Sequence, residues 1–267
     1  MSWVCRNAQY SSWYKSRSLE TIHTFVVYIS AFDQDARIPQ NGIFGKCHGR
    51  ISPHIYTEQE LSKLMKAAEH LFSPDGIRIM TVKTALGLLW STGLRVSELT
   101  SLKISDVDPD KGLIFVRQSK FKKSRIIPLH PSVIKKLTDY SQFIAKHLRQ
   151  RQNNDYYFVS SGNSRFTRAF EYAFHLISPC LYNDENCRLP RRKPRLYDFR
   201  HTFACRTVKN WLDTGEDVNE KLFLLSTYMG HVKPEETFWY LSATPELLSV
   251  SCRKYEKLFG TEGGVYE

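Results

Sequence analysis

The sequence lacks the features of a secreted, membrane-spanning or zinc-binding protein. Its six cysteines are scattered, with no CxxC pair and no histidine at zinc-finger spacing, so we expect free, mostly buried thiols in a reducing compartment. The longest apolar run, FVVYI at 25–29, is far too short to cross a bilayer, and no secretory signal pattern opens the chain. A cytoplasmic protein with no membrane partner is therefore expected.

Acidic residues are also scarce relative to basic ones. The chain has 27 Asp and Glu against 38 Lys and Arg, which gives a formal net charge of +11 over 267 residues. Such an excess favours a polyanionic partner through long-range attraction. Charge alone leaves a basic protein of unrelated function equally open. With 42% hydrophobic residues the composition is that of an ordinary globular protein.

The N-terminal part of the chain has its own organisation. Apolar residues recur at helical spacing over 18–32, which predicts one amphipathic helix. Residues 36–53 are rich in Gly and Pro without periodicity, which is typical of a linker. We therefore expect a boundary near Pro53, with a small module at 1–52 and a larger domain at 53–267.

The larger segment predicts an α+β fold that is mainly helical, with a small antiparallel sheet. Thr57 and Glu60 form a capping box that begins a helix, and a second helix should end at Gly93. Apolar spacing indicates further helices and a hairpin; we expect strands at 113–118 and 124–129, helices at about 131–148 and 164–178, and more helix toward the C-terminus.

Five short segments supply cationic side chains and one phenol. They are STGLRVSEL with Arg95, QSKFKKSR with Lys120, RLYDFRHTFA with Arg200 and His201, TYMGHV with His231, and FWYL with Tyr240. A phosphodiester under attack gains negative charge on its non-bridging oxygens, and guanidinium groups bind that charge in bidentate fashion. A phenol, whose ordinary pKa is about 10, needs cations or a base nearby to act as a nucleophile. The set predicts phosphodiester cleavage without a metal or other cofactor.

Each of these residues also has a purely structural interpretation. An arginine just after a helix-ending glycine, such as Arg95, is often a surface charge, and Lys120 in a lysine-rich turn is often only solvated. His231 fits a turn with a satisfied histidine, and Tyr240 in an aromatic run fits a core position. The functional interpretation depends on their occurring together.

The ordered set of motifs resembles the tyrosine recombinases, also called phage integrases. That family has a TGLR-x-x-E motif, a Lys on a β-hairpin, an H-x-L-R-H-T motif, an L-G-H motif and a nucleophilic Tyr nine residues after that last His. Here these are STGLRVSEL, SKFKKSRIIPL, YDFRHTF, YMGHV and Tyr240. The resemblance covers about residues 53–250 and implies the family's catalytic-domain fold.

The resemblance implies a role for each matching residue. Arg95 and Arg200 would bind the scissile phosphate, and His231 would donate to a non-bridging oxygen. Lys120 would protonate the leaving 5′ oxygen, while Tyr240 would attack to form a 3′-phosphotyrosyl intermediate. Rejoining would then need neither ATP nor metal.

Supporting residues follow from the same motifs. Glu98 would hold Arg95, and His201 would assist near the phenol. The family's usual His at the first position of H-x-x-R is Tyr197 here. A phenol donates a hydrogen bond to phosphate but does not act as a base near neutral pH, so we expect slower chemistry.

The N-terminal module is the second departure from the family pattern. Relatives usually carry a helical core-binding domain of about a hundred residues, whereas only 52 residues precede Pro53 here. We interpret 1–52 as a shortened core-binding remnant, either natural or truncated. Fewer neutralised phosphates would weaken DNA binding.

A basic stretch directly precedes the YDFRH motif. Its members are Arg188, Arg191, Arg192, Lys193 and Arg195. Contacts from such a stretch to the DNA backbone would position the duplex without reading its sequence. A solvated loop is the open alternative.

The leading hypothesis is a DNA strand transferase that serves integration, excision or transposition of a mobile element. Its partners would be double-stranded DNA and three further copies of the chain, with no small-molecule substrate. The segment after Tyr240 would dock on a neighbouring copy or on its own core. Two alternatives remain open, a catalytically impaired DNA-binding regulator of recombination sites and a type IB topoisomerase-like relaxing enzyme.

Overall fold

The computed structural model describes residues 10–45, 53–117, 124–148, 151–153, 155–160, 162, 164–182, 193–231 and 237. The chain divides into two compact units, residues 1–51 and residues 52–267.

The first unit contains helix α2, Ser12–Ile29. The Ser11 side chain caps the helix by accepting from the backbone N–H of Tyr14 at 3.3 Å. This cap explains why the helix begins six residues earlier than the apolar spacing predicts. The Ser16 hydroxyl donates to the carbonyl of Gly45 at 2.6 Å, which fastens the following segment to the helix. The assignment of this unit as a core-binding remnant stays a prediction.

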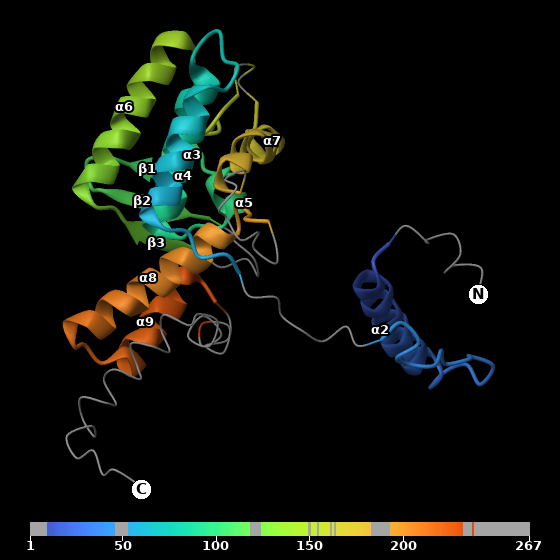
Figure 1. Ribbon diagram of the computed structural model, residues 1–267. Helices are drawn as coiled ribbons and strands as arrows, with labels where there is room; N and C mark the ends of the chain where they lie inside the picture. Colours follow the sequence, from blue (N-terminus) through green and yellow to red (C-terminus); the bar gives the residue numbers. More distant parts are fainter. Residues whose placement is uncertain are drawn as a thin grey trace, which may run out of the picture. The chain divides into compact units, whose positions relative to one another are not determined.

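The second unit is mainly helical with a small antiparallel sheet, as expected from the sequence (Figure 1). Its elements are α3 (Glu58–Glu69), α4 (Ile77–Thr92), α5 (Val96–Leu99), η1 (Ile104–Asp106), β1 (Val107–Asp108), β2 (Leu113–Val116), β3 (Arg125–Pro128), α6 (Pro131–His147), α7 (Thr167–Ile177), η3 (Ser178–Leu181), α8 (Asp198–Thr214) and α9 (Val218–Met229).

Two helix ends follow directly from local sequence. Thr57 accepts from the backbone N–H of Glu60 at 3.1 Å, and the Glu60 carboxylate accepts from that of Thr57 at 2.8 Å, so the predicted capping box is confirmed. Helix α4 ends at Gly93, whose φ of 62° lies in the left-handed region, again as predicted.

The sheet has three described strands in the order β1-β2-β3. Strands β2 and β3 pair antiparallel, with Leu113 opposite Pro128 and Val116 opposite Arg125. The expected hairpin is confirmed over these residues. Strand β1 was not predicted, because two residues are too few to show an alternating pattern.

Helix α4 is the centre of the core. It packs against α3, α6 and α8, and residues such as Val82, Ala85 and Leu86 are fully buried (Figure 1). A smaller cluster, which includes Val208 and Leu222, joins α8 to α9. The C-terminal end of α4 therefore lies where the chain segments of the candidate site meet.

Two cysteines fall within the described residues, and both are free thiols: Cys205 is buried and Cys180 is partly buried. Of the helices that the structure describes, none has the length and apolar character needed to cross a bilayer.

Candidate active site

Arg95 and Glu98 form the first part of the site, just after α4. Because Gly93 turns the chain, Arg95 becomes the N-cap of the short helix α5 and Glu98 its third residue. The Glu98 carboxylate accepts from the backbone N–H of Arg95 at 3.0 Å and from its Nη1 at 2.7 Å. The Arg95 side chain is only 15% exposed, so it is not the solvated surface charge of the structural interpretation.

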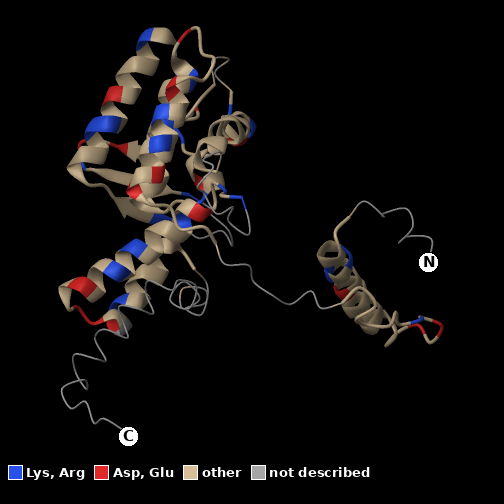
Figure 2. Cartoon of the chain, in the orientation of Figure 1, with Lys and Arg blue, Asp and Glu red and all other residues tan. Residues whose placement is uncertain are grey.

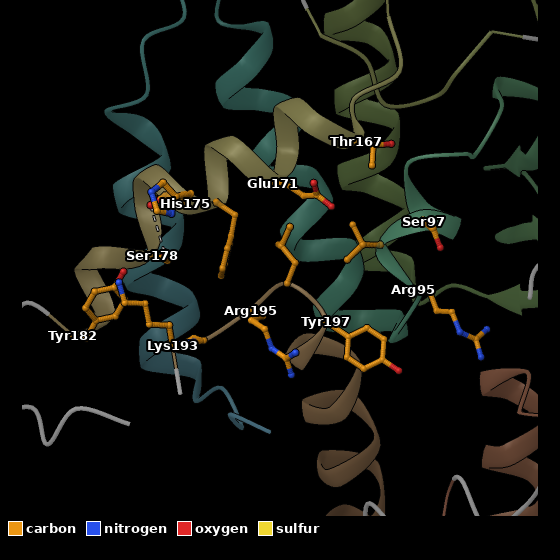
Figure 3. Close-up of a pocket in the computed structure, with 14 residues that line it drawn as sticks. Arg95, Ser97, Thr167, Glu171, His175, Ser178, Tyr182, Lys193, Arg195 and Tyr197 are labelled. Atoms are coloured by element: carbon orange, nitrogen blue, oxygen red, sulfur yellow. Dashed lines mark hydrogen bonds between the residues drawn. The ribbon is translucent and has the colours of Figure 1, made fainter. Parts of the chain in front are cut away.

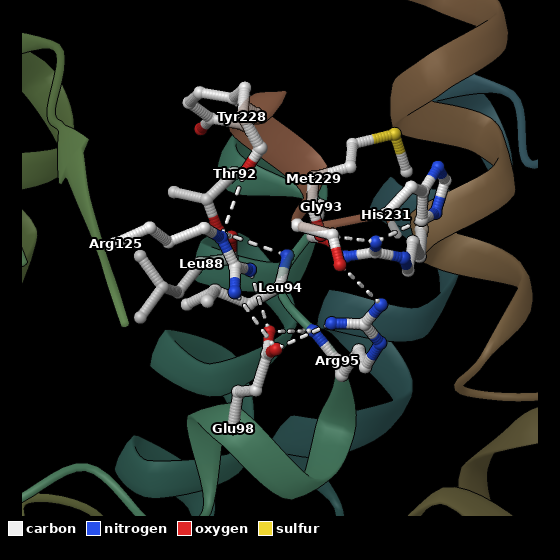
Figure 4. A network of polar contacts seen from close by, with 12 residues as sticks. Leu88, Thr92, Gly93, Leu94, Arg95, Glu98, Arg125, Tyr228, Met229 and His231 are labelled. Carbon is white, nitrogen blue, oxygen red and sulfur yellow. Dashed lines mark hydrogen bonds and ion pairs between the residues drawn. The ribbon is translucent and has the colours of Figure 1, made fainter. Parts of the chain in front are cut away.

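A second arginine, Arg125 at the start of β3, binds the same carboxylate. Its Nη1 and Nη2 donate to the two oxygens of Glu98 at 3.0 and 2.8 Å, and its Nε donates to the carbonyl of Tyr228 at 2.8 Å (Figure 4). The sequence interpretation missed this residue. In KFKKSR it is one of four basic residues, and nothing in the spacing separates it from the lysines.

The Glu98 carboxylate stays ionised despite its burial. Burial alone would raise its pKa, but the hydrogen bonds and charge of Arg125 and the hydrogen bonds from Arg95 lower the pKa to about 2. The carboxylate thus accepts four hydrogen bonds from the two arginines.

Arg200 is the most buried charge of the site, with a side chain in the first turn of α8. It is 1% exposed. Its Nη1 donates to the carbonyl of Gly93 at 3.0 Å and its Nη2 to that of Met229 at 2.5 Å. One guanidinium therefore joins the ends of α4 and α9.

His231 follows Gly230 at the end of α9 and lies against Arg200. The Arg200 Nη2 and the His231 Nε2 are 3.0 Å apart, and the His231 Nδ1 lies 2.7 Å from the Thr237 Oγ1. A guanidinium only donates, so Nε2 accepts and Nδ1 carries the ring proton. Burial and then the charges of Arg200, Arg95 and Arg125 lower the pKa of His231 to about 3, which keeps the ring neutral at pH 7.

Tyr197 and His201 lie one helical turn apart at the start of α8. Their rings meet edge to face with centroids 5.1 Å apart. Tyr197 is 45% exposed, whereas His201 is buried. Burial and the charges of Arg195 and Arg200 lower the pKa of His201 to about 4. The phenol therefore faces outward and the neutral imidazole supports it from inside.

A cavity of about 520 Å³ adjoins these residues (Figure 3). Arg95 and Tyr197 line it, together with Lys193 and Arg195 of the basic stretch. The Arg195 Nη2 also donates to Asp198 at 2.9 Å, which ties that stretch to α8. The cavity thus has cationic side chains along its wall.

The structure brings together four of the predicted catalytic and supporting residues, namely Arg95, Glu98, Arg200 and His231, in one polar network (Figure 4). Other predicted residues lie outside the described residues: Lys120, Tyr240, Arg188, Arg191 and Arg192. With Arg125 the network has three guanidinium groups and one carboxylate, which leaves a formal charge of +2. This net positive charge favours an anionic ligand such as a phosphate.

Comparisons with known proteins agree with this architecture. An integrase/recombinase by name, y4rB of Sinorhizobium fredii, is 32% identical over 263 residues, which are 96% of this chain and 82% of that protein. Tyrosine recombinase XerA of Pyrococcus furiosus is 27% identical over 79% of this chain and 65% of its own length. The solved XerH recombinase, in a post-cleavage complex with its difH substrate, has the same fold with a TM-score of 0.66 at 16% identity, over 95% of this chain and 70% of that one.

The chain belongs to the phage integrase family, the tyrosine-type DNA recombinases, whose family model matches residues 55–246. The resemblance inferred from the motifs is therefore confirmed for the family and for the fold. Site-specific recombination is the activity that this membership assigns.

Proposed function

We propose that the protein cleaves and rejoins DNA strands through a 3′-phosphotyrosyl intermediate. One observation carries the proposal: Arg95, Arg200 and His231, far apart in sequence, join in one network at the ends of α4, α8 and α9. These are the positions at which the motifs expect phosphate ligands. A function that handles a phosphodiester gives all three a common purpose.

In the proposed step the Tyr240 oxygen attacks the scissile phosphorus. The P–O5′ bond breaks, Lys120 gives its proton to the leaving 5′ oxygen, and the phenol proton passes to water or a neighbouring base. Arg95 and Arg200 balance the added charge on the non-bridging oxygens. Rejoining reverses the step, with the 5′ hydroxyl of another strand as the attacking group.

Double-stranded DNA is the proposed partner. The net charge of +11 favours it, and Lys and Arg outnumber Asp and Glu along α8 (Figure 2). XerH, which shares the fold, was solved on its DNA substrate. Exchange between two duplexes cuts four strands, and with one nucleophile per chain this requires four protomers. We extend the proposal to a tetramer that integrates, excises or transposes a mobile element.

The two alternative functions explain less of the site. A DNA-binding regulator without catalysis needs no pair of phosphate-directed arginines beside a neutral histidine, yet Arg95, Arg200 and His231 are all in place. A relaxing topoisomerase shares the covalent step but acts on one duplex. A recombinase exchanges strands between two duplexes and a topoisomerase does not, so a strand-exchange assay distinguishes the two.

The test is covalent capture on nicked suicide duplexes taken from the DNA that flanks the gene. We expect a protein–DNA adduct that Tyr240→Phe abolishes. Tyr172→Phe is the matched control, since Tyr172 is an exposed tyrosine on α7, and it should leave the adduct unchanged. An adduct that survives Tyr240→Phe would overturn the assignment of the nucleophile, and relaxation without strand exchange would favour the topoisomerase.

A further inference from the structure

Arg125 changes the charge balance around the proposed phosphate ligand Arg95. Glu98 lies 2.7 Å from the Arg95 Nη1, and a carboxylate at that distance would by itself cancel the charge of Arg95. Arg125 occupies both oxygens of the same carboxylate. With Arg125 present, the three groups carry a formal charge of +1 instead of zero.

Arg125 also holds the turn that leads into His231. Its Nε donates to the Tyr228 carbonyl in the last turn of α9. Gly230 lies directly over the guanidinium, because a Cβ added at Gly230 would come within 3.1 Å of the Arg125 Nη1. The Gly230 carbonyl in turn accepts from the Arg95 Nη2 at 3.3 Å. The backbone before His231 is thus held by both arginines.

The Arg125 side chain is turned into the protein. It is 11% exposed, whereas Arg117, at the other side of the same hairpin, is 64% exposed. Three of its N–H groups donate hydrogen bonds within the protein, two to Glu98 and one to Tyr228. Any effect of Arg125 on DNA chemistry therefore passes through its neighbours.

We propose that Arg125 is a positioning residue for strand cleavage, which offsets the charge of Glu98 so that Arg95 keeps a net attraction for the phosphate, and which fixes the turn before His231. The inference rests on the proposed function, since it concerns the same phosphate site. Arg125 lies in the segment SKFKKSRIIPL, in which the family motif specifies only the hairpin lysine, so the motif itself gives Arg125 no role.

The test is a double-mutant cycle between Arg125 and Glu98, read as single-turnover cleavage of a suicide duplex at saturating protein. We expect Arg125→Met to slow cleavage about 100-fold, the size of effect that a misplaced catalytic group has. Glu98→Gln alone should slow cleavage about tenfold. The double variant should lose much less than the product of the two single losses, because the unbalanced carboxylate is gone, while the lost Tyr228 contact should keep it slower than Glu98→Gln.

A purely structural role predicts a different pattern. If Arg125 only held the fold, Arg125→Met measured well below its melting temperature would cleave at the wild-type rate, and any loss of cleavage would follow the melting temperature. That outcome would overturn the inference. Arg78→Met is the matched control, because Arg78 lies at the other end of α4, against the Tyr172 ring, and cleavage should be unchanged.

A conservative variant keeps the inference testable if Arg125→Met does not fold. Arg125→Lys retains the charge but not the bidentate contact or the Nε donor. We expect Arg125→Lys to slow cleavage about tenfold, and we expect the added Glu98→Gln change not to restore the rate. A restored rate would contradict the charge argument. The proposed function is tested separately by the wild-type adduct and its loss in Tyr240→Phe, so a missing adduct would contradict that function. Additive losses in the Arg125 and Glu98 variants would contradict only the role proposed for Arg125.

Discussion

Arg200 donates from its Nη2 to the Nε2 of His231 across 3.0 Å, so the nitrogen that faces Arg200 is an acceptor. The ring proton lies on Nδ1 and is directed to Thr237. In the proposed reaction His231 donates to a phosphate oxygen, which requires an N–H that points to the DNA. For Nε2 to donate to the phosphate in the proposed reaction, DNA binding would have to protonate the ring or exchange its tautomer.

The first prediction concerns this tautomer. In the free protein at pH 7, nitrogen NMR of the histidine rings should show His231 neutral, with the proton on Nδ1. Addition of cognate DNA to the cleavage-blocked Tyr240→Phe protein should shift the signal to a ring protonated at Nε2. Thr237→Val should weaken the preference for Nδ1 in the free protein. A free protein already protonated at Nε2 would contradict the network.

The second prediction follows from the two lowered histidine pKa values. Burial lowers the pKa of His231 to about 3 and that of His201 to about 4, below the unfolded value of about 6.5. The unfolded chain then binds more protons, so the stability is complete above pH 6.5 and is lost as the pH falls toward 4. From pH 7 to pH 5 the free energy of unfolding should drop, with up to about 2 kcal/mol from His201. Urea unfolding of wild type and His201→Gln at both pH values measures this change in the free energy of unfolding. An equal drop in the variant would exclude His201 as its cause.

Local signals in the sequence were sufficient for helix ends and for the motif arginines. The Thr57 capping box and the Gly93 turn depend on neighbouring residues alone, so the sequence shows them. Arg125 could not be recognised, because its role depends on contacts with Glu98 and Tyr228, which are 27 and 103 residues away. Such contacts arise from tertiary packing, which no periodicity encodes.

The burial of α4 and of Arg200 could not be predicted from the sequence for the same reason. Helix α4 has no polar face along most of its length, and α3, α6 and α8 cover it. The burial of Arg200 and the partial burial of His231 depend on how α4, α8 and α9 meet, and the lowered pKa of His231 follows from its own burial and from the nearby charge of Arg200. The residue types in the motifs predict the chemistry of the site. Its pKa values depend on burial and on charges brought close by the fold, so they cannot be predicted from the motifs.

The third prediction tests the turn that places Arg95. Gly93 has φ 62°, and an added Cβ would lie 2.5 Å from the Phe203 ring. Gly215 also has positive φ, at 79°, but an added Cβ would meet nothing within 4 Å. We expect Gly215→Ala to cost about 1 kcal/mol and Gly93→Ala about 3 kcal/mol or more, because the overlap adds to the backbone strain. Denaturant unfolding measures both, and equal losses would show that the Phe203 ring moves aside freely.

The fourth prediction concerns Tyr197, where the family has a histidine. The phenol is 45% exposed beside the cavity and packs on His201. Tyr197→His should raise the single-turnover cleavage rate by about 10- to 100-fold, since an imidazole transfers protons near pH 7 and a phenol does not. Tyr197→Phe, which keeps the ring and removes only the hydroxyl, should slow cleavage modestly. An unchanged rate in Tyr197→His would place Tyr197 outside the catalytic site.

The last prediction tests the basic stretch before α8. Lys193 lies at the cavity wall, and Arg191 and Arg192 precede it in the sequence. If all three contact phosphates, their replacement by Gln should reduce the slope of log affinity against log salt by up to about 2.7, at about 0.9 for each contact. The control is the same loss of charge on α6, with Lys135, Lys136 and Lys146 replaced by Gln. Equal slopes for the two triple variants would mean that net charge alone acts, and an unchanged slope in the first would favour a solvated loop. A reduced slope confined to the first variant, with its cleavage rate at saturation retained, would assign the stretch to positioning the DNA backbone and leave the chemistry to the arginine network.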